Sequence, residues 1–382
     1  MNILFISPSN TIGGAERSLY EMLKYLHGQG HNLFVALPPS NEREFEYLLR
    51  PYVSGLLFIP LMPVNCLSGL SFFQSLKGWT KRLLDSRGAW LYSVPRLIRF
   101  IRRHRIDRVH TNTLLVLDGA FAARWTGIPH VQHVREITGY GAGALYALPL
   151  QKRPQWFKRL AGKLHHLIIA NSKYVAAAHA AFFPSDKIRV CYNIVETGEI
   201  AARDGFHPLT LGMVANVSSR VKNHLLFIRV AALLAPRFPD LRFYIYGKMP
   251  PAADPYRQSL EQAVVRYGLQ KKLYFKGVCN DPVAMYGNLG ALLHPYPYET
   301  FGRIYVEAMG HGLPVVAAAG GGATELISND ETGLLFTPDD AEQAALLLEN
   351  LLTTPELYAR LSRNGIRHAQ TFRLVRFFDC FD

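Results

Sequence analysis

The fold is decided by a pattern that first occurs in residues 2–26, NILFISPSNTIGGAERSLYEMLKYL. An apolar, β-branched run, Asn2–Ser7, is followed by Pro8 and by the pair Gly13-Gly14. Apolar residues at helical spacing come next: Leu19, Met22, Leu23 and Leu26. The stretch therefore predicts a buried strand, a glycine-containing turn and a helix.

The same alternation continues in two series. The first predicts strands at His31–Leu37, Arg108–His110 and Leu167–Ala170, with a helix near 95–104. A polar stretch over residues 196–208 interrupts it, and the second series predicts strands Leu209–Val214, Arg242–Tyr246, Leu273–Lys276, Ala291–His294 and Pro314–Ala317, with helices over 223–235, 256–266, 302–311 and 356–378. Strands that alternate with helices predict parallel sheets covered on both faces. We expect an α/β protein of two doubly wound, Rossmann-like domains that face each other across a cleft, with the hinge in the polar stretch.

Composition excludes several classes of protein. The 382 residues, 49% hydrophobic and 19% charged, match an ordinary folded chain and not a disordered or fibrous one. The four cysteines are scattered singly, so neither a zinc site nor a disulfide framework is indicated. The first residues lack the pattern of a signal peptide, and no apolar run approaches the ~18 residues of a membrane span. We expect a cytoplasmic protein.

The charge is concentrated in one half of the chain. Residues 1–200 hold 24 Lys and Arg against 12 Asp and Glu, whereas residues 201–382 hold 18 against 17. The first half therefore carries +12 and the second +1. This asymmetry favours an anionic partner for the first half, such as lipid headgroups, phosphorylated acceptors or nucleic acid, although a merely soluble basic surface stays open.

Two basic segments with aromatic neighbours refine this expectation. Residues 79–108 hold nine Lys and Arg and two acids, and residues 151–163 add five cations around Trp156 and Phe157. One helical face of the first segment gathers Val94, Leu97, Ile98 and Ile101, while Arg96, Arg99, Arg102 and Arg103 fall elsewhere. Such a helix, near Trp79, Trp90 and Tyr92, suits an anionic membrane surface or a lipid-linked acceptor. A domain helix with a solvated basic face remains the alternative.

The strongest chemical signal is a pair of carboxylates in residues 299–307, ETFGRIYVE. Glu299 lies in the loop after a predicted strand, and Glu307 lies in the following helix. The helix start between them offers unpaired N–H groups around residues 301–303, which favour a phosphate. Glu299 could accept hydrogen bonds from sugar hydroxyls and Glu307 from a ribose. The alternative is a pair of surface acids, but the apolar neighbours of Glu307 favour a functional or paired carboxylate.

These residues and their flanks resemble family 4 of the retaining glycosyltransferases, which have the GT-B fold. The resemblance rests on HPYPYETFG at 294–302, VEAMGHGLPVV at 306–316, GGGATE at 320–325 and Thr332-Gly333. It extends to GGAE at 13–16 and to Ala170-Asn-Ser172 with Asn193, so it spans the chain. It implies an acceptor-side domain over 1–200, a donor domain over 201–367, and a C-terminal helix, 368–382, that packs back on the first domain.

The resemblance also implies the activity. A sugar would move, with retained configuration, from a nucleotide-diphosphate sugar to a glycan or lipid-linked acceptor in cell-surface polysaccharide or lipopolysaccharide synthesis, on the cytoplasmic membrane face. Glu299 would hold the sugar, Glu307 the ribose, and the helix start with Thr300, Phe301 and Gly302 the diphosphate. We find no convincing carboxylate cluster for Mg²⁺ or Mn²⁺, so we expect metal-independent transfer without a further cofactor.

A second element of the site is NVSSRVKNH at 216–224. Cations beside a helix start can neutralise a departing diphosphate, which suits Lys222. The family places an arginine five or six residues before this lysine, where this chain has Asn216 and Val217. Arg220 could replace that arginine, and solvated loop cations are the alternative.

Three further positions belong to the predicted site. His133 ends a strand in GIPHVQHVRE, 127–136, and is a candidate hydrogen-bond partner of the substrate or a general base, although a lone histidine is more often structural. The pair Gly13-Gly14 would bring backbone amides close to a ligand, or only form a tight turn. Glu325 would brace the donor pocket or cap the next helix. Arg135 and Glu136 could form an ion pair.

Three other kinds of protein share some of these sequence features. A nucleotide-dependent dehydrogenase is disfavoured because no G-x-G-x-x-G follows the first strand. A nucleic-acid-binding protein would suit the charge, but no recognised module is present. A catalytically silent sugar-nucleotide-binding scaffold of the same fold remains the main alternative, because the family's arginine is missing.

Overall fold

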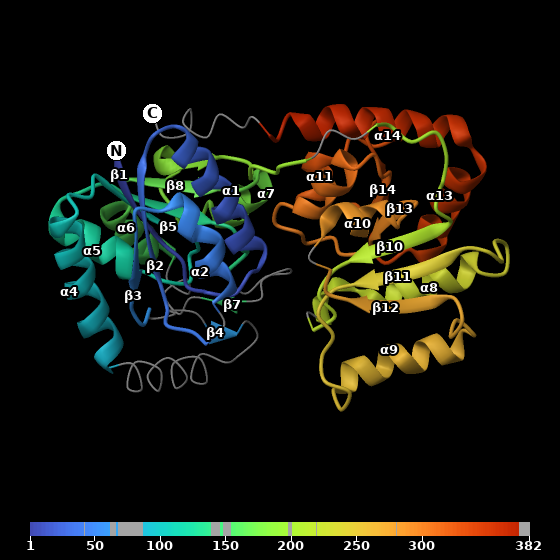
Figure 1. The fold of residues 1–382 in the computed structure, drawn as a ribbon, viewed down its shortest axis with the longest axis horizontal. Coiled ribbons are helices and arrows are strands. Elements are labelled where there is room, and N and C mark those ends of the chain that lie inside the picture. Colours follow the sequence, from blue (N-terminus) through green and yellow to red (C-terminus); the bar gives the residue numbers. More distant parts are fainter. Residues whose placement is uncertain are drawn as a thin grey trace. The chain divides into compact units, whose positions relative to one another are not determined.

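The computed structural model describes residues 1–41, 43–61, 66–67, 87–138, 146–147, 154–197, 201–218, 220–279 and 281–373. The chain divides into two compact units, one of residues Met1–Ile194 and one that begins at Val195 (Figure 1). The division lies next to the polar stretch in which we expected the hinge. Among the described residues, no helix is long and apolar enough to cross a bilayer.

The first unit is built on a seven-stranded parallel sheet of order β3-β2-β1-β5-β6-β8-β9. Its strands are β1 (Asn2–Ile6), β2 (Asn32–Leu37), β3 (Gly55–Phe58), β5 (Arg108–Thr111), β6 (His130–Val134), β8 (Leu167–Ala170) and β9 (Ile188–Val190). Its helices are α1 (Gly14–Gly28), α2 (Glu44–Leu49), α4 (Arg87–Arg103), α5 (Asp118–Thr126), α6 (Pro154–Leu164) and α7 (Lys173–His179), with 3₁₀ turns Arg50–Tyr52 and Ser185–Lys187. Two short segments, β4 (Cys66–Leu67) and β7 (Tyr146–Ala147), pair in antiparallel fashion.

Alternation along the strands explains why helices cover both faces of this sheet. Ile3 and Phe5 of β1 pack in one cluster with Leu23 of α1, whereas Leu4 and Ile6 pack in another with residues of α4 and α5. Successive side chains of a strand point to opposite faces of the sheet, so an unbroken apolar run requires helices on both faces to bury it.

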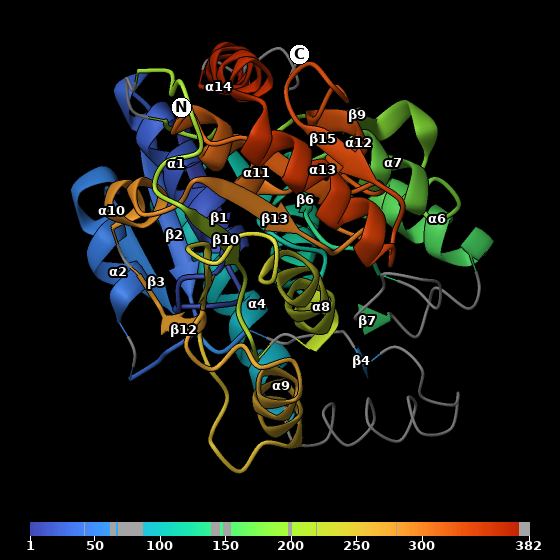
Figure 2. The same cartoon turned by 90° about the vertical axis from the view of Figure 1, so that its right-hand side faces the viewer.

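The second unit repeats this plan with a six-stranded parallel sheet of order β12-β11-β10-β13-β14-β15. Its strands are β10 (Thr210–Val214), β11 (Arg242–Tyr246), β12 (Leu273–Gly277), β13 (Ala291–His294), β14 (Val315–Ala318) and β15 (Leu334–Phe336). Its helices are α8 (His224–Leu234), α9 (Pro255–Arg266), α10 (Pro282–Gly287), α11 (Arg303–Gly310), α12 (Ala323–Leu326), α13 (Ala341–Thr353) and α14 (Pro355–Gln370). Helices α8 and α13 lie side by side and share the core with Leu211 and Leu293 (Figure 2).

The prediction of two doubly wound α/β domains is confirmed. Each strand and helix that the sequence predicts in the described part of the chain is present, with bounds that differ by a few residues. Elements that the sequence analysis did not predict include the strand β15 and the helices α6, α7, α10 and α13. Of these, β15, α7 and α10 are short.

The predicted helix over 356–378 is wrong at its C-terminal end. Helix α14 stops at Gln370, and residues 371–373 form a turn. The turn lets Phe372 pack edge-on against Phe301, with ring centroids 6.0 Å apart, while its carbonyl accepts a hydrogen bond from the amide of Val195. Burial of an aromatic ring outweighs continuation of the helix here. The predicted return of residues 368–382 to the first domain falls largely outside the described residues.

Candidate functional site

The strand order of the second unit marks a topological switch point. Strands β10 and β13 are neighbours in the sheet. After β10 the chain continues to β11 on one side of this pair, and after β13 it continues to β14 on the other side. Ligands of open α/β sheets bind at such a switch point, outside the carboxyl ends of the strands. The loop after β10 ends in a 3₁₀ turn, Arg220–Lys222, and the loop after β13 spans residues 295–302. Both loops carry predicted site residues.

The two loops meet at Glu299. The Lys222 ammonium donates a hydrogen bond to Oε1 of Glu299, and Nε2 of His294 lies 3.0 Å from the same oxygen. The Lys222 nitrogen also lies 4.4 Å from the centroid of the Tyr296 ring, which adds a cation–π contact. The side chains of Lys222 and Glu299 are 22% and 16% exposed, so the pair is partly open to a ligand.

The charges of this pair fix the ionisation of Glu299. Burial alone would raise the pKa of its carboxyl, but the Lys222 charge and the hydrogen bond from His294 outweigh burial and hold the pKa below its ordinary range. Burial lowers the pKa of His294, against the opposing effect of Glu299. Near neutral pH the site therefore holds an ionised carboxylate, an ammonium and a neutral imidazole.

The start of α11 follows directly. Gly302 precedes the helix with φ of 90°, a left-handed conformation that favours glycine, and a Cβ there would lie 2.3 Å from the Tyr305 ring. The first amides of a helix have no partner within it, which makes this start suitable for an anion. One turn further, Glu307 accepts hydrogen bonds from Tyr286 Oη at 3.0 Å and Arg303 Nη2 at 3.2 Å. Glu307 is thus a paired carboxylate, and Tyr286 and Arg303 hold its orientation.

The glycine turn at residues 320–322 packs against the backbone of the loop that carries Glu299. A Cβ on Gly321 would lie 2.4 Å from the carbonyl oxygen of Glu299, and one on Gly322 would lie 2.1 Å from that of Phe301. The amide of Gly322 donates to the Glu299 carbonyl at 2.7 Å. The turn therefore fixes the backbone that carries Glu299, and it has no room for side chains. Glu325 lies within the short helix that follows, whose N-cap is Gly322.

The remaining predicted residues of this unit have different environments. Thr300 is half-buried, whereas the ring of Phe301 is buried in the protein, so only the backbone of Phe301 is placed to meet a ligand. Val217 lies in the hydrophobic core, and Asn216 accepts a hydrogen bond from the amide of Lys248. Both positions are therefore structural. The side chain of Arg220 lies outside the described residues.

In the first unit, His133 belongs to a buried polar cluster at the carboxyl end of β6. Arg135 donates from Nη2 to His133 Nδ1 at 3.2 Å, from Nε to Asn112 at 2.9 Å, and from Nη1 to Asn193. Because a guanidinium only donates, Nδ1 of His133 must accept, and the ring hydrogen lies on Nε2. Burial, followed by the Arg135 charge, lowers the pKa of His133 well below its ordinary value, so the ring is neutral.

The Glu136 carboxylate pairs with backbone amides, and not with the Arg135 guanidinium as the possible ion pair of the sequence analysis would require. The Glu136 carboxylate accepts hydrogen bonds from the backbone amides of Leu114 at 2.6 Å and Arg135 at 3.0 Å. Burial raises its pKa to about 7 despite these bonds. The Arg135 guanidinium instead turns to the amides of Asn112 and Asn193 and to His133.

Gly13 and Gly14 lie at the same edge of the first sheet. Gly13 is the exposed N-cap of α1, with φ of −118°, and Gly14 has no atom near a would-be Cβ. Neither residue has a positive φ, so backbone conformation does not require glycine at either position. Glu16 lies close to Gly13 and is buried, and burial raises its pKa against the effect of the Arg135 charge.

Two family models match the chain and together cover nearly all of it. The model described as Glycosyltransferase Family 4 matches residues 12–199, and the one described as Glycosyl transferases group 1 matches residues 207–368. The chain belongs to the group 1, family 4 glycosyltransferases. The resemblance seen in the sequence is thereby confirmed, and the site described above lies in the group 1 segment.

Curated relatives of this family member match over shorter segments. A D-inositol 3-phosphate glycosyltransferase of Corynebacterium glutamicum is 33% identical over 162 residues, which cover 40% of this chain and 37% of the relative. One from Thermomonospora curvata is 28% identical over 150 residues, covering 38% and 35%. The chain thus matches little more than a third of the length of these relatives.

Solved glycosyltransferase structures share the fold over the whole chain. Anabaena HepE in complex with UDP and glucose has a TM-score of 0.76 and 23% identity, covering 98% of this chain and 97% of that one. The lipopolysaccharide outer core galactosyltransferase WaaB has a TM-score of 0.67 and 15% identity, covering 100% and 98%. The GT-B fold predicted from the sequence is therefore confirmed.

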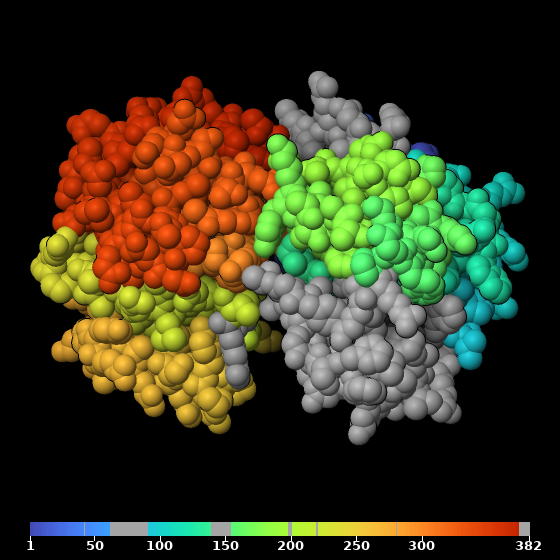
Figure 3. Space-filling model, turned by 180° about the vertical axis from the view of Figure 1, so that it is seen from behind, coloured from blue at the N-terminus to red at the C-terminus, as the bar shows by residue number. Residues whose placement is uncertain are grey.

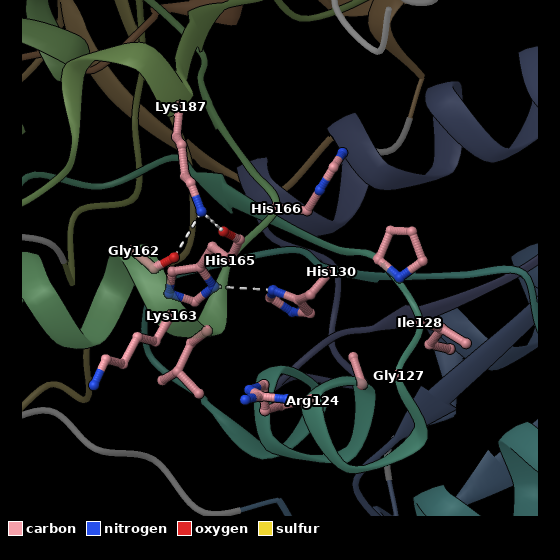
Figure 4. Close-up of a pocket in the computed structure, with 12 residues that line it drawn as sticks. Arg124, Gly127, Ile128, His130, Gly162, Lys163, His165, His166 and Lys187 are labelled. Carbon is pink, nitrogen blue, oxygen red and sulfur yellow. Dashed lines mark hydrogen bonds between the residues drawn. The ribbon is translucent and has the colours of Figure 1, made fainter.

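A separate pocket in the first unit has a structural explanation. A cavity of about 410 Å³ opens at the amino ends of β6 and β8 and is lined by Arg124, Lys163 and Lys187 (Figure 4). Lys187 donates to the carbonyl oxygens of Gly162 at 2.6 Å and His165 at 2.9 Å, and Arg124 and Lys163 lie in the last turns of α5 and α6. Cations balance the negative end of a helix, so helix termini account for this charge without a ligand.

The structure thus brings part of the predicted site together. Lys222, Glu299, Gly302 and Glu307 share one edge of the second sheet, and Gly13 and His133 share one edge of the first. The sequence analysis gave no role to Tyr286, Tyr296 or Arg303, nor to His294 by itself. The signal for His294 was available, since a polar residue closes an otherwise apolar strand.

Proposed function

We propose that this chain is a retaining, metal-independent glycosyltransferase that transfers a sugar from a nucleoside diphosphate sugar to a glycan or lipid-linked acceptor of the cell surface. The observation that carries the proposal is the Lys222–Glu299 pair beside the start of α11, with Glu307 one turn along the same helix. A cation, a helix start and two carboxylates match the parts of such a donor: diphosphate, sugar and ribose.

The chemistry follows from these positions. As the bond between the anomeric carbon and the diphosphate oxygen breaks, negative charge builds on the diphosphate and positive charge on the sugar. Lys222 and the first amides of α11 would stabilise the departing diphosphate, which is the largest contribution such a site can make. The acceptor hydroxyl bonds to the anomeric carbon, and its proton passes to the diphosphate. Lys222 would serve in place of a metal ion.

The relatives support the donor and the class of acceptor. The Anabaena structure holds UDP and glucose, so UDP-sugars are the first donors to test. WaaB is a lipopolysaccharide galactosyltransferase, which favours a cell-surface glycan as the product. We further propose that the protein works on the cytoplasmic face of the membrane.

A thermal-shift panel of UDP-, GDP- and ADP-sugars tests donor binding. We expect one nucleotide series to raise the melting temperature, because a ligand that binds only the folded state stabilises it. Transfer or slow donor hydrolysis with that series would separate an enzyme from a silent scaffold. Binding without either reaction would support the scaffold, and no shift with any donor would contradict the proposed donor site.

We propose that the first unit binds an anionic membrane surface through α4 and α6. In α4, Leu97 and Ile101 are buried while Arg96, Arg99, Arg102 and Arg103 are exposed, as the sequence predicts. The side chains of Leu91 and Trp156 are also exposed. Atoms of the segment 154–197, which contains α6, lie at the surface of this unit in the view of Figure 3. Trp79 and the side chain of Trp90 lie outside the described residues.

A vesicle-binding assay tests this surface. We expect binding to phosphatidylglycerol vesicles that salt weakens, and little binding to phosphatidylcholine vesicles. Replacement of Arg96, Arg99 and Arg103 by Glu should abolish it. Replacement of Arg266, Lys271 and Lys276, exposed cations of the second unit, is the matched control and should change binding little. Equal, negligible binding to both lipids would overturn the proposal.

A further inference from the structure

His294 is a buried polar residue at the end of an apolar strand. It closes β13 after Ala291, Leu292 and Leu293, and its side chain is almost wholly buried. Its Nε2 lies 3.0 Å from Oε1 of Glu299, whereas its buried Nδ1 has no hydrogen-bond partner among the described residues. A buried acceptor without a partner is unfavourable, so an apolar residue would suit this position better if packing alone mattered. The hydrogen bond to Glu299 is the compensating interaction.

The direction of that hydrogen bond assigns the tautomer. An ionised carboxylate can only accept, so Nε2 of His294 must carry the hydrogen. In a neutral imidazole the other nitrogen is then bare, which agrees with the unpartnered Nδ1. His294 therefore donates one hydrogen bond to Glu299 and brings no charge to the site.

Both hydrogen bonds that the structure gives the Glu299 carboxylate end on one oxygen. Lys222 and His294 each donate to Oε1, and they approach it from different elements, the 3₁₀ turn after β10 and the end of β13. Two donors on one oxygen restrict rotation of the carboxylate about its last bond. The second oxygen, Oε2, is left to accept from a ligand.

We propose that His294 is a positioning residue, which together with Lys222 anchors Oε1 of Glu299 so that Oε2 meets a hydroxyl of the donor sugar. This inference rests on the proposed function, since the sugar is the ligand of that oxygen. His294 itself does not contact the reacting atoms. Lys222 alone would hold the charge of Glu299 but not the plane of its carboxylate.

Removal of His294 has a consequence that a merely structural residue would not produce. Among the described residues, the charged and titratable groups that face Glu299 and His294 are Lys222 before α8, His224 at the start of α8, Tyr296 in the loop and Tyr305 on α11. Both tyrosines stay neutral near pH 7, and burial raises the pKa of Tyr305 further, so they add no charge. Loss of the His294 donor then leaves Lys222 alone to oppose the effect of burial. The pKa of Glu299 must rise.

The test is a ¹³C NMR titration of the glutamate carboxyl groups, with the Glu299 signal assigned by its loss in Glu299→Gln. We expect His294→Leu to raise the pKa of Glu299 by about one unit, the size expected for one hydrogen bond to a charged group. His294→Gln keeps an N–H that can reach the carboxylate, so the pKa of Glu299 in this variant should stay close to its wild-type value. His368→Leu, which replaces a histidine of α14 that packs on Phe372, is the control and should leave Glu299 unchanged.

Ligand binding gives a second readout. His294→Leu should weaken binding of the nucleotide sugar selected by the thermal-shift panel about tenfold or more. Binding of the matching nucleoside diphosphate should stay within about twofold of wild type, because Oε2 meets only the sugar. If wild type binds no nucleotide sugar of the UDP, GDP or ADP series, the proposed function fails, and the titration still decides the role of His294. An unchanged Glu299 pKa in a folded His294→Leu variant would overturn the inference. If that variant does not fold, ¹⁵N shifts of wild type decide, since hydrogen on Nδ1 of His294 would contradict it.

Discussion

Lys222→Ala should lower the rate of sugar transfer by about a hundredfold to a thousandfold, the usual effect of removing one group that stabilises a developing charge. Lys222 is a cation that contacts Glu299 at the switch point. If it stabilises the departing diphosphate as proposed, its loss leaves the first amides of α11 to do so. Single-turnover kinetics with saturating donor would measure the effect on the chemical step. The rate of wild type should not change when EDTA is added.

Lys276→Ala is the matched control for this variant. Lys276 is an exposed lysine of β12 whose nitrogen lies 4.9 Å from the Tyr244 ring centroid. Strands β11 and β10 separate β12 from β13, the strand that precedes the Glu299 loop. This variant should transfer sugar at nearly the wild-type rate. Equal rates for Lys222→Ala and wild type would remove the leaving-group role, and a strong loss in EDTA would contradict metal independence.

Lys222→Ala should also alter the pH dependence of the reaction. The Lys222 charge holds the pKa of Glu299 below its ordinary range, so the carboxylate of wild type stays ionised through mildly acidic pH. Without the lysine, burial raises that pKa, and the carboxylate becomes protonated as the pH falls. The acid limb of the residual activity should therefore move to higher pH in Lys222→Ala.

The sequence could predict those parts of the fold and site that depend on local patterns. Apolar runs such as Leu209–Val214 are buried on both faces of a parallel sheet, and this doubly buried pattern is visible without a structure. Lys222 and Glu299 could be identified because each follows a predicted strand and lies in a motif that resembles the family's. Their contact needed the strand order, since 77 residues separate them along the chain.

Long-range packing explains what the sequence could not predict. The end of α14 depends on the contact of Phe372 with Phe301, and no helix-stop signal announces it. Tyr286 reaches Glu307 from α10, a short helix whose role is visible only in three dimensions. His133 was predicted as a single site residue, but its hydrogen bonds depend on Arg135, which Asn112 and Asn193 hold from distant segments.

Glu307→Ala should weaken binding of the nucleoside diphosphate by about ten- to a hundredfold, as expected for loss of hydrogen bonds to a charged group. Isothermal titration calorimetry with the best donor nucleotide would measure it. Glu342→Ala, which removes an exposed carboxylate of α13 that pairs with Arg229 of α8, is the matched control and should bind as wild type does.

A nucleotide that lacks both ribose hydroxyls separates a ribose contact from a general electrostatic effect. If Glu307 accepts from the ribose, wild type should bind the analogue about as weakly as Glu307→Ala binds the normal nucleotide, and the variant should lose little more with the analogue. Such non-additivity is the mark of two groups in contact. Additive losses would instead mean that Glu307 acts by holding Arg303 and Tyr286 in place, because both donate to its carboxylate. The ribose role would then have to be given up, while the diphosphate site at the start of α11 would stand.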